Sequence, residues 1–146
     1  MSIKLDVPLV KQLRSMSCWY ASVCMVAFYR EAGPRLGLPD KWNANNGINL
    51  NDFIKLAQVE GLASIKPPNL DLTAQQLEVF LRNSGPIWCA GKWDGVPHIV
   101  VLTGIENNKI YINDPNPAKG KRVETLIWFN QKLDSHVQNC MMYKPG

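Results

Sequence analysis

Cys18 is the residue of this chain best placed to act as a nucleophile. It stands between a short polar stretch (RSMS) and a long apolar run (WYASVCMVAFY). We expect this run to be a helix that begins near Cys18. A helix N-terminus carries unsatisfied N–H groups and a partial positive charge, and both favour a thiolate over a thiol. Cys24 lies well inside the same run and suits this role less.

A thiolate nucleophile needs a base, and His98 is the better of the two histidines. It follows a turn-like stretch (WDGVP) and opens a strongly apolar segment (HIVVLTGI). A ring at the mouth of a buried strand can project toward a cleft. His136 lies in a polar segment (LDSHVQN) and is expected at the surface. The alternative for His98 is a hydrogen-bonded strand-end residue without a catalytic role.

An imidazole base needs a third group that orients its ring. Asn107 and Asn108 predict a tight turn, which would send the chain back antiparallel to the strand that starts at His98. The return strand ends with Asn113 and Asp114, close to the level of His98. Neighbouring strand residues face opposite sides, so only one of the two can point at the ring. Asp114 is the predicted partner, and Asn113 is the alternative.

Attack of a thiolate on a carbonyl group creates an oxyanion, which needs preorganised hydrogen-bond donors. Gln12 precedes Cys18 on a polar lead-in that contains no glycine. Its side-chain amide and the backbone N–H of Cys18 would supply two donors. The predicted catalytic residues are therefore Cys18, His98, Asp114 and Gln12.

The remaining cysteines, Cys24, Cys89 and Cys140, are each surrounded by apolar neighbours, which is typical of small buried side chains. They show no paired Cys-x-x-Cys spacing and no histidine at a ligand spacing. We therefore expect no metal and no cofactor. The sequence start resembles no secretory signal, so we expect neither export through such a signal nor disulfide bonds.

The charge pattern argues against a nucleic-acid partner. The formal net charge is +4, from 16 Lys and Arg against 12 Asp and Glu, and these residues are scattered. The densest basic group, Lys119, Lys121 and Arg122, is expected to be a short surface loop rather than a binding patch. No apolar run reaches the roughly 20 residues that a membrane span needs.

Helical patterns precede strand patterns along the chain, which indicates an α+β fold. We expect a helical layer, with the helix at 18–30 buried at its centre, packed on a small antiparallel β-sheet. The chain has the length of one domain, and we expect residues 1–146 to form a single unit. The expected helices lie within 18–30, 49–61, 70–85 and 124–133, the expected strands within 86–93, 98–106, 109–115 and 139–144, an extended segment at 5–12, and a loop at 34–47 after a helix stop at Gly33-Pro34.

The order of Gln12, Cys18-Trp19, His98 and the INDP stretch resembles the papain-like cysteine proteases. The stretch VPLVKQLRSMSCWYAS resembles papain-like effectors that bacterial pathogens inject into other cells. The stretch GPIWCAGKWDGVPHIVVLTGIENNKIYINDP is similar to the peptidase domains of bacteriocin-processing transporters. Transporter peptidases usually carry glycine after the cysteine, so the SCW context favours the effector branch. The resemblance runs from Val7 to about Leu133.

This resemblance implies a papain-like fold and a Cys-His-Asp mechanism. Cys18 would be the nucleophile, His98 the general base and acid, and Asp114 the group that orients the imidazole, with Gln12 in the oxyanion hole. It also implies a bacterial effector or toxin that is made in the producer's cytoplasm and delivered by a secretion system into a target cell. A cognate immunity protein is a further implied partner.

We therefore expect an endopeptidase that cleaves protein substrates through an acyl-thioester intermediate. The alternatives are a deamidase, a transglutaminase-like transferase or a cell-wall amidase with the same Cys–His machinery, and a non-catalytic binding module on this fold. Trp88, Trp93 and Tyr20 could line a substrate cleft, although residues of this kind more often lie in the core or on the surface.

Overall fold

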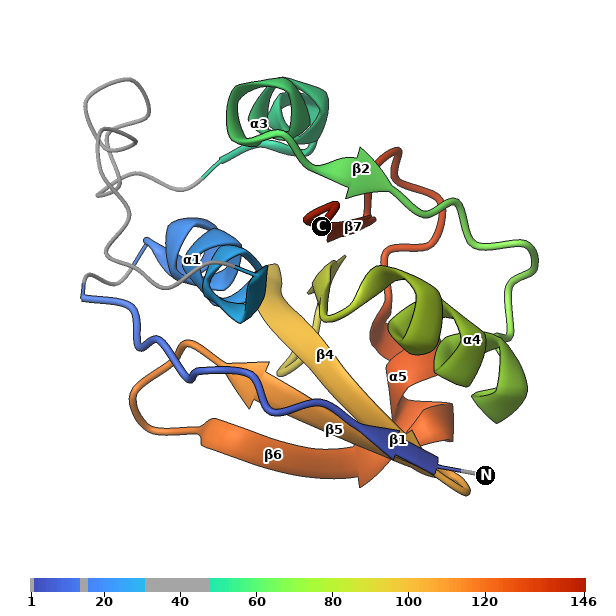
Figure 1. The fold of residues 1–146 in the computed structure, drawn as a ribbon. Coiled ribbons are helices and arrows are strands. Elements are labelled where there is room, and N and C mark those ends of the chain that lie inside the picture. Colours follow the sequence, from blue (N-terminus) through green and yellow to red (C-terminus); the bar gives the residue numbers. More distant parts are fainter. Residues whose placement is uncertain (1, 14–15, 31–47) are drawn as a thin grey trace.

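The computed structural model describes residues 2–13, 16–30 and 48–146 (Figure 1). The predicted loop at 34–47 and the helix stop at Gly33-Pro34 lie outside these residues. The helices are α1 (Cys18–Arg30), the 3-10 turn η1 (Leu50–Asp52), α3 (Phe53–Glu60), α4 (Ala74–Ser84) and α5 (Leu126–Lys132). The strands are β1 (Ser2–Lys4), β2 (Ala63–Ser64), β3 (Ile87–Gly91), β4 (His98–Glu106), β5 (Lys109–Asp114), β6 (Gly120–Thr125) and β7 (Met141–Tyr143).

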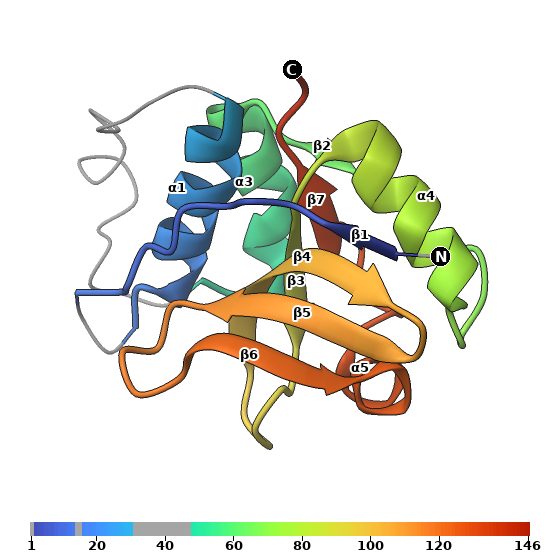
Figure 2. The same ribbon diagram turned by 60° about the horizontal axis from the view of Figure 1, so that its bottom comes forward.

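The predicted α+β architecture is confirmed. The seven-stranded sheet has the order β2-β7-β3-β4-β5-β6, with β1 added beside β4, and every strand pair is antiparallel. Figures 1 and 2 show α1, α3 and α4 gathered on one side of β4 and β5, while α5 lies just beyond the end of β6. The long strand β4 therefore runs through the middle of the molecule.

Helix α1 is enclosed by protein, as its apolar run predicts. Residues 21–27 and Trp19 are buried, so water reaches little of the helix apart from its ends. Two contacts fix it against the sheet. The Ser22 hydroxyl lies 3.5 Å from the Ile99 carbonyl oxygen, and the Trp88 indole N–H donates to the Trp19 carbonyl at 3.2 Å. These contacts anchor the first turns of α1 beside the start of β4.

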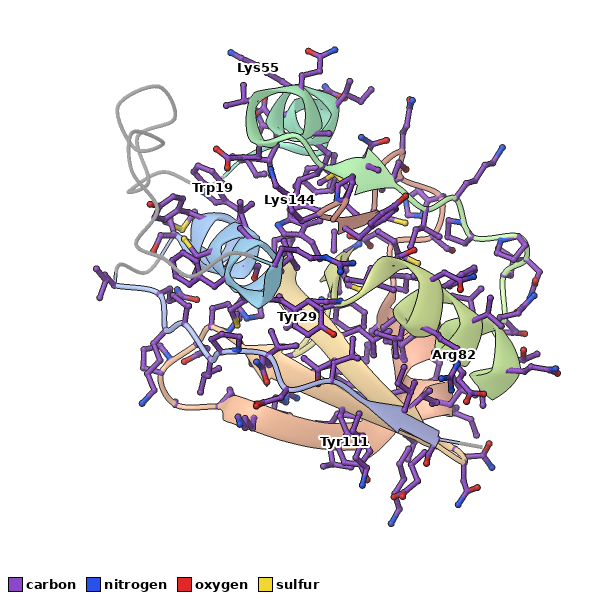
Figure 3. The ribbon with its side chains drawn as sticks, in the orientation of Figure 1. Trp19, Tyr29, Lys55, Arg82, Tyr111 and Lys144 are labelled. Atoms are coloured by element: carbon purple, nitrogen blue, oxygen red, sulfur yellow. The ribbon has the colours of Figure 1, made fainter. Side chains whose placement is uncertain are left out.

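The other predicted helices begin and end at capping residues. The Thr73 hydroxyl accepts a hydrogen bond from the Gln76 N–H at the start of α4, and the Thr73 N–H donates one to Gln76 Oε1. Gly61 ends α3 with a φ of 66°, a left-handed conformation that glycine adopts without steric penalty. In Figure 3, Lys55 points outward from α3, and Tyr111 points from β5 to the side of the sheet away from the helices.

Three strands differ from the sequence-based expectation. Strand β6 lies where a basic loop was expected, and β1 and β2 were not predicted. The β6 sequence (GKRVET) is polar at nearly every position and gives no alternating apolar signal, because one side of this edge strand faces water. Strands β1 and β2 have only three and two residues, too few for a periodic pattern.

Candidate active site

Cys18, His98 and Gln12 line one cleft, which has a volume of about 510 Å³. They come from the start of α1, the start of β4 and the lead-in segment before α1. Apolar side chains form much of the wall, and a few polar groups lie among them. The apolar lining comprises Met16, Trp19, Ile48, Leu50, Phe53, Val96, Pro97 and Ile99, and the polar lining includes Asp94, Asn116, Lys119 and Asp134. Three of the four predicted site residues therefore share a concave, partly apolar surface, and Asp114 lies buried behind it.

Cys18 is the first residue of α1 and is partly accessible, whereas Cys24, Cys89 and Cys140 are buried. Ser22, one helical turn later on the same face, contacts the carbonyl of Ile99. Since Ile99 directly follows His98, this packing brings the Cys18 face of the helix to the His98 end of β4. The two side chains are close enough that Cys18 helps to raise the pKa of His98.

His98 contacts Asp114 on its other side. The His98 Nε2 atom lies 2.6 Å from Asp114 Oδ1, and the Asp114 side chain is fully buried. Because Nε2 is engaged by Asp114, Nδ1 is the ring nitrogen left for the thiol. The backbone N–H of Asn116 donates to the same Oδ1 at 2.9 Å. Asn113 has a different partner, since its amide donates to the Val7 carbonyl at 3.1 Å.

A β-bulge decides which of these two residues faces His98. Next to the turn between β4 and β5, Glu106 pairs with Lys109. The pairing shifts by one residue between Leu102 and Gly104, so that farther from the turn Val101 pairs with Asn113. A one-residue shift exchanges the two faces of a strand. With the shift, Asp114 shares a face with His98; in the register set by the turn, Asn113 would take that place.

The electrostatics of the site favour a charged imidazole. Burial alone would lower the pKa of His98, but hydrogen bonds with Asp114 and Cys18 outweigh it and raise this pKa to about 9. Burial would raise the pKa of Asp114, and the hydrogen bonds from His98 and the Asn116 N–H instead hold it below its usual value. The pair is therefore a carboxylate and an imidazolium at neutral pH.

Gln12 is held beside the Asp114 end of β5. Its backbone N–H donates to the Pro115 carbonyl at 2.7 Å, and its half-buried side chain lines the cleft with Cys18. The lead-in is thereby fixed to the sheet at this point. The place of Gln12 is compatible with an oxyanion donor, and that role stays a prediction.

Arg122 was missed as a site residue, and the expectation of a basic surface loop is wrong for it. Lys119 and Lys121 are exposed, but Arg122 lies in β6 with only 11% of its side chain accessible. Its guanidinium donates to Asp114 Oδ2 at 2.8 Å and to Asp94 on the cleft wall at 2.9 and 3.0 Å. No sequence signal marked it, because the strand that directs it inward was not recognised.

The three aromatic residues considered for the cleft do not line it in the described part of the chain. Trp88 and Trp93 are fully buried core residues, and Trp93 stacks on Phe129 with 5.3 Å between ring centroids. Tyr20 is not one of the residues that line the cleft in the described part of the chain. Trp19 lines it instead, and Figure 3 shows this side chain between α1 and the start of the α3 region.

Within the described ranges, no three His, Cys, Asp or Glu side chains are grouped so that they could hold a metal ion. None of the helices described there is long and apolar enough to cross a membrane. The four cysteines are free thiols. The chemical groups at the cleft are the thiol of Cys18, the imidazole of His98 next to it, and the carboxylate of Asp114 behind the imidazole.

Comparisons with known proteins place this arrangement in a family. Residues 1–134 match the model of the family Peptidase_C70, described as "Papain-like cysteine protease AvrRpt2". A double glycine motif protease from an AMS/PCAT transporter, solved with its leader peptide, shares the fold at a TM-score of 0.62 and 22% identity, over 98% of this chain and 94% of that one.

The peptidase domain of Streptococcus ComA, a bifunctional ABC transporter of a quorum-sensing pathway, is similar at a TM-score of 0.68 and 20% identity. That match covers 94% of this chain and 98% of the other. The predicted likeness to papain-like proteases and to transporter peptidase domains is therefore confirmed.

Proposed function

Because this chain belongs to the AvrRpt2 family of papain-like cysteine proteases and is thus a cysteine peptidase, we propose that it is an endopeptidase whose catalytic residues are Cys18, His98, Asp114 and Gln12. The observation that carries the proposal is the position of His98. Its ring joins the accessible thiol of Cys18 to the buried carboxylate of Asp114 inside a cleft. This is the arrangement that activates a thiol for attack on a carbonyl group.

In the acylation step, the Cys18 thiolate attacks the carbonyl carbon of the scissile peptide bond. The oxyanion that forms accepts hydrogen bonds from the Gln12 amide and the Cys18 N–H. The His98 imidazolium then gives its proton to the leaving amine, the C–N bond breaks, and an acyl-thioester remains on Cys18. Asp114 holds the ring and stabilises its charged form throughout.

In the deacylation step, the now neutral His98 takes a proton from water as the water attacks the thioester carbonyl. The second oxyanion uses the same donors. When it collapses, the C–S bond breaks, the acid product leaves, and the Cys18 thiolate beside the His98 imidazolium is restored. The cycle consumes one water molecule for each peptide bond and returns every group of the chain to its starting state.

The test is a comparison of protein termini in cells that produce the wild type or Cys18→Ala, with Cys24→Ala as the matched control in the same helix. New termini that appear with the wild type and Cys24→Ala, and not with Cys18→Ala, support an endopeptidase. Deamidated or crosslinked glutamine, or released cell-wall fragments, without new termini would contradict it and favour another acyl-transfer reaction. No change of any kind would favour a binding module.

Delivery into a target cell belongs to the same proposal. It is supported by the likeness of the VPLVKQLRSMSCWYAS stretch to injected effectors, and an immunity protein would then protect the producer by covering the Cys18 cleft. A reporter fused to the chain should reach the cytoplasm of target cells in a manner that depends on the producer's secretion system. A signal confined to the producer would contradict delivery.

A further inference from the structure

Arg122 is held by three carboxylates on the face of the sheet that carries His98 and Asp114. Its Nη1 donates to Asp94 Oδ2 at 2.9 Å and to Asp114 Oδ2 at 2.8 Å. Its Nη2 donates to Asp94 Oδ1 at 3.0 Å and to Glu124 Oε2 at 2.9 Å, and its Nε donates to Glu124 Oε2 at 3.2 Å. The five N–H donors of the guanidinium are thus all used.

The packing around this guanidinium fixes its plane. The Arg122 side chain is 11% exposed, and its Cζ atom lies 5.2 Å from the centroid of the Trp128 ring. A surface arginine with one flexible partner would contribute little. Five hydrogen bonds and a stacked ring instead define a single orientation, which makes Arg122 a rigid reference point for its partners.

Arg122 makes one of the three hydrogen bonds that hold the Asp114 carboxylate. Oδ1 accepts from His98 and from the Asn116 N–H, and Oδ2 accepts from Arg122. Without Arg122, Oδ2 of a fully buried carboxylate would lose this partner. The carboxylate would then be free to rotate away from the imidazole or to take up a proton.

Asp94 joins the same guanidinium to the wall of the cleft. It lies in the connection between β3 and β4, next to the cleft-lining residues Val96 and Pro97. Its two carboxylate oxygens pair with Nη1 and Nη2 in the bidentate geometry that lysine cannot reproduce. The cleft wall and the carboxylate behind His98 therefore share one support.

We propose that Arg122 is a positioning residue for catalysis: it holds the Asp114 carboxylate against His98 and fixes the cleft wall through Asp94. The inference rests on the proposed roles of Cys18, His98 and Asp114. It assigns Arg122 no contact with the substrate or the reacting atoms. Its effect on the rate passes through Asp114, and its effect on substrate binding passes through Asp94.

A double-mutant cycle tests the first of these paths. Arg122→Met should lower kcat by about tenfold or more, and Asp114→Asn should lower it at least as far. If Arg122 acts through Asp114, adding Arg122→Met to Asp114→Asn should lower kcat no further than about twofold, because the interaction is already lost. A structural role alone would lower kcat equally in both backgrounds.

The second path predicts a different kinetic signature. Asp94→Asn should raise KM more than it lowers kcat, since it loosens the cleft wall and leaves the Arg122–Asp114 contact. Glu124→Gln is the matched control, because Glu124 touches the same guanidinium but neither Asp114 nor the cleft lining; we expect its kcat and KM within about threefold of the wild type. Arg122→Met should also move the acidic limb of kcat/KM to higher pH, because the carboxylate loses a neighbouring cation.

Folding is checked by thermal unfolding of every variant. If Arg122→Met does not fold, Arg122→Lys serves in its place, since it keeps the charge and cannot hold Asp94 and Asp114 together. The same double-mutant cycle can be measured on the rate at which iodoacetamide alkylates Cys18, which needs no substrate. An inactive wild type would then count against the proposed peptidase, and the role of Arg122 could still be tested by alkylation. Equal losses in both backgrounds, or wild-type kcat, KM and alkylation in the Arg122 variants, would overturn it.

Discussion

The imidazole of His98 and the carboxylate of Asp114 meet at 2.6 Å across two antiparallel strands because β4 carries a bulge. The turn at Asn107 alone sets a register that would present Asn113 instead. The shift between Leu102 and Gly104 exchanges the faces of β5 and turns Asp114 inward. One extra residue in a strand thus selects a charged partner for the imidazole in place of a neutral one.

Substitutions at the two neighbouring residues should separate catalysis from stability. Asp114→Ala should lower kcat by about 10²–10⁴-fold, less than His98→Ala, because it removes the group behind the base and leaves the base itself. Asn113→Ala is the matched control: it should lower the free energy of unfolding by about 1–3 kcal/mol through the lost bond to the Val7 carbonyl, with kcat nearly unchanged. Steady-state kinetics and urea unfolding measure both, and full activity in Asp114→Ala would contradict the assignment.

The pH dependence should follow His98. Its pKa is raised to about 9, and the imidazolium is the form that protonates the leaving amine, so kcat/KM should fall as the pH rises through about 9. Asp114→Asn should move this alkaline limb to lower pH, since the bond to Asp114 is one cause of the raised pKa. A pH–rate profile measures both limbs, and an identical alkaline limb in the two proteins would speak against the pair.

Protein stability should depend on pH through the same group. A histidine whose pKa is raised by folding stabilises the native state fully below its unfolded pKa of about 6.5. That contribution should be lost as the pH rises through about 9. Thermal unfolding across this range should show a smaller decline for His98→Ala than for the wild type. Equal declines would mean that other groups dominate.

Gln12→Ala should lower kcat by about 10²–10³-fold if the side chain is an oxyanion donor. KM should change little, because the donor acts mainly in the transition state. The fold should be retained, since the backbone bond to Pro115 that anchors the segment does not involve the side chain. Lys11→Ala, at the exposed neighbouring position, is the control. A Gln12→Ala variant with the wild-type kcat would mean that the Gln12 side chain is not an oxyanion donor.

Gly104→Ala should destabilise the junction between the N-terminal strand and the bulge. A Cβ atom at this position would lie 2.8 Å from the Ile3 carbonyl oxygen, a backbone atom that cannot move without shifting β1. Overpacking of this kind costs about 1–3 kcal/mol, which urea unfolding measures. Unchanged stability would mean that β1 is easily displaced from β4.

The sequence alone predicted the chemical groups of the site better than it predicted the residues around them. The positions of Cys18 and His98 could be predicted because each residue marks the start of a strongly apolar element, and their catalytic roles stay predictions. Asp114 could be preferred over Asn113 as the partner of His98, but strand periodicity could not exclude Asn113, since a bulge leaves no mark in a hydrophobic pattern. Arg122 was out of reach because its inward direction depends on β6, a polar edge strand. The residues that line the cleft could not be predicted from a helix or strand pattern, because they come from loops and helix ends.

The measurement closest to the central claim is the rate at which iodoacetamide alkylates Cys18 near pH 6, followed cysteine by cysteine with mass spectrometry. If the imidazolium of His98 stabilises the Cys18 thiolate, the rate should fall at least about tenfold in His98→Ala, with Cys24, Cys89 and Cys140 slow in both proteins. Equal Cys18 rates in the wild type and His98→Ala would contradict the account.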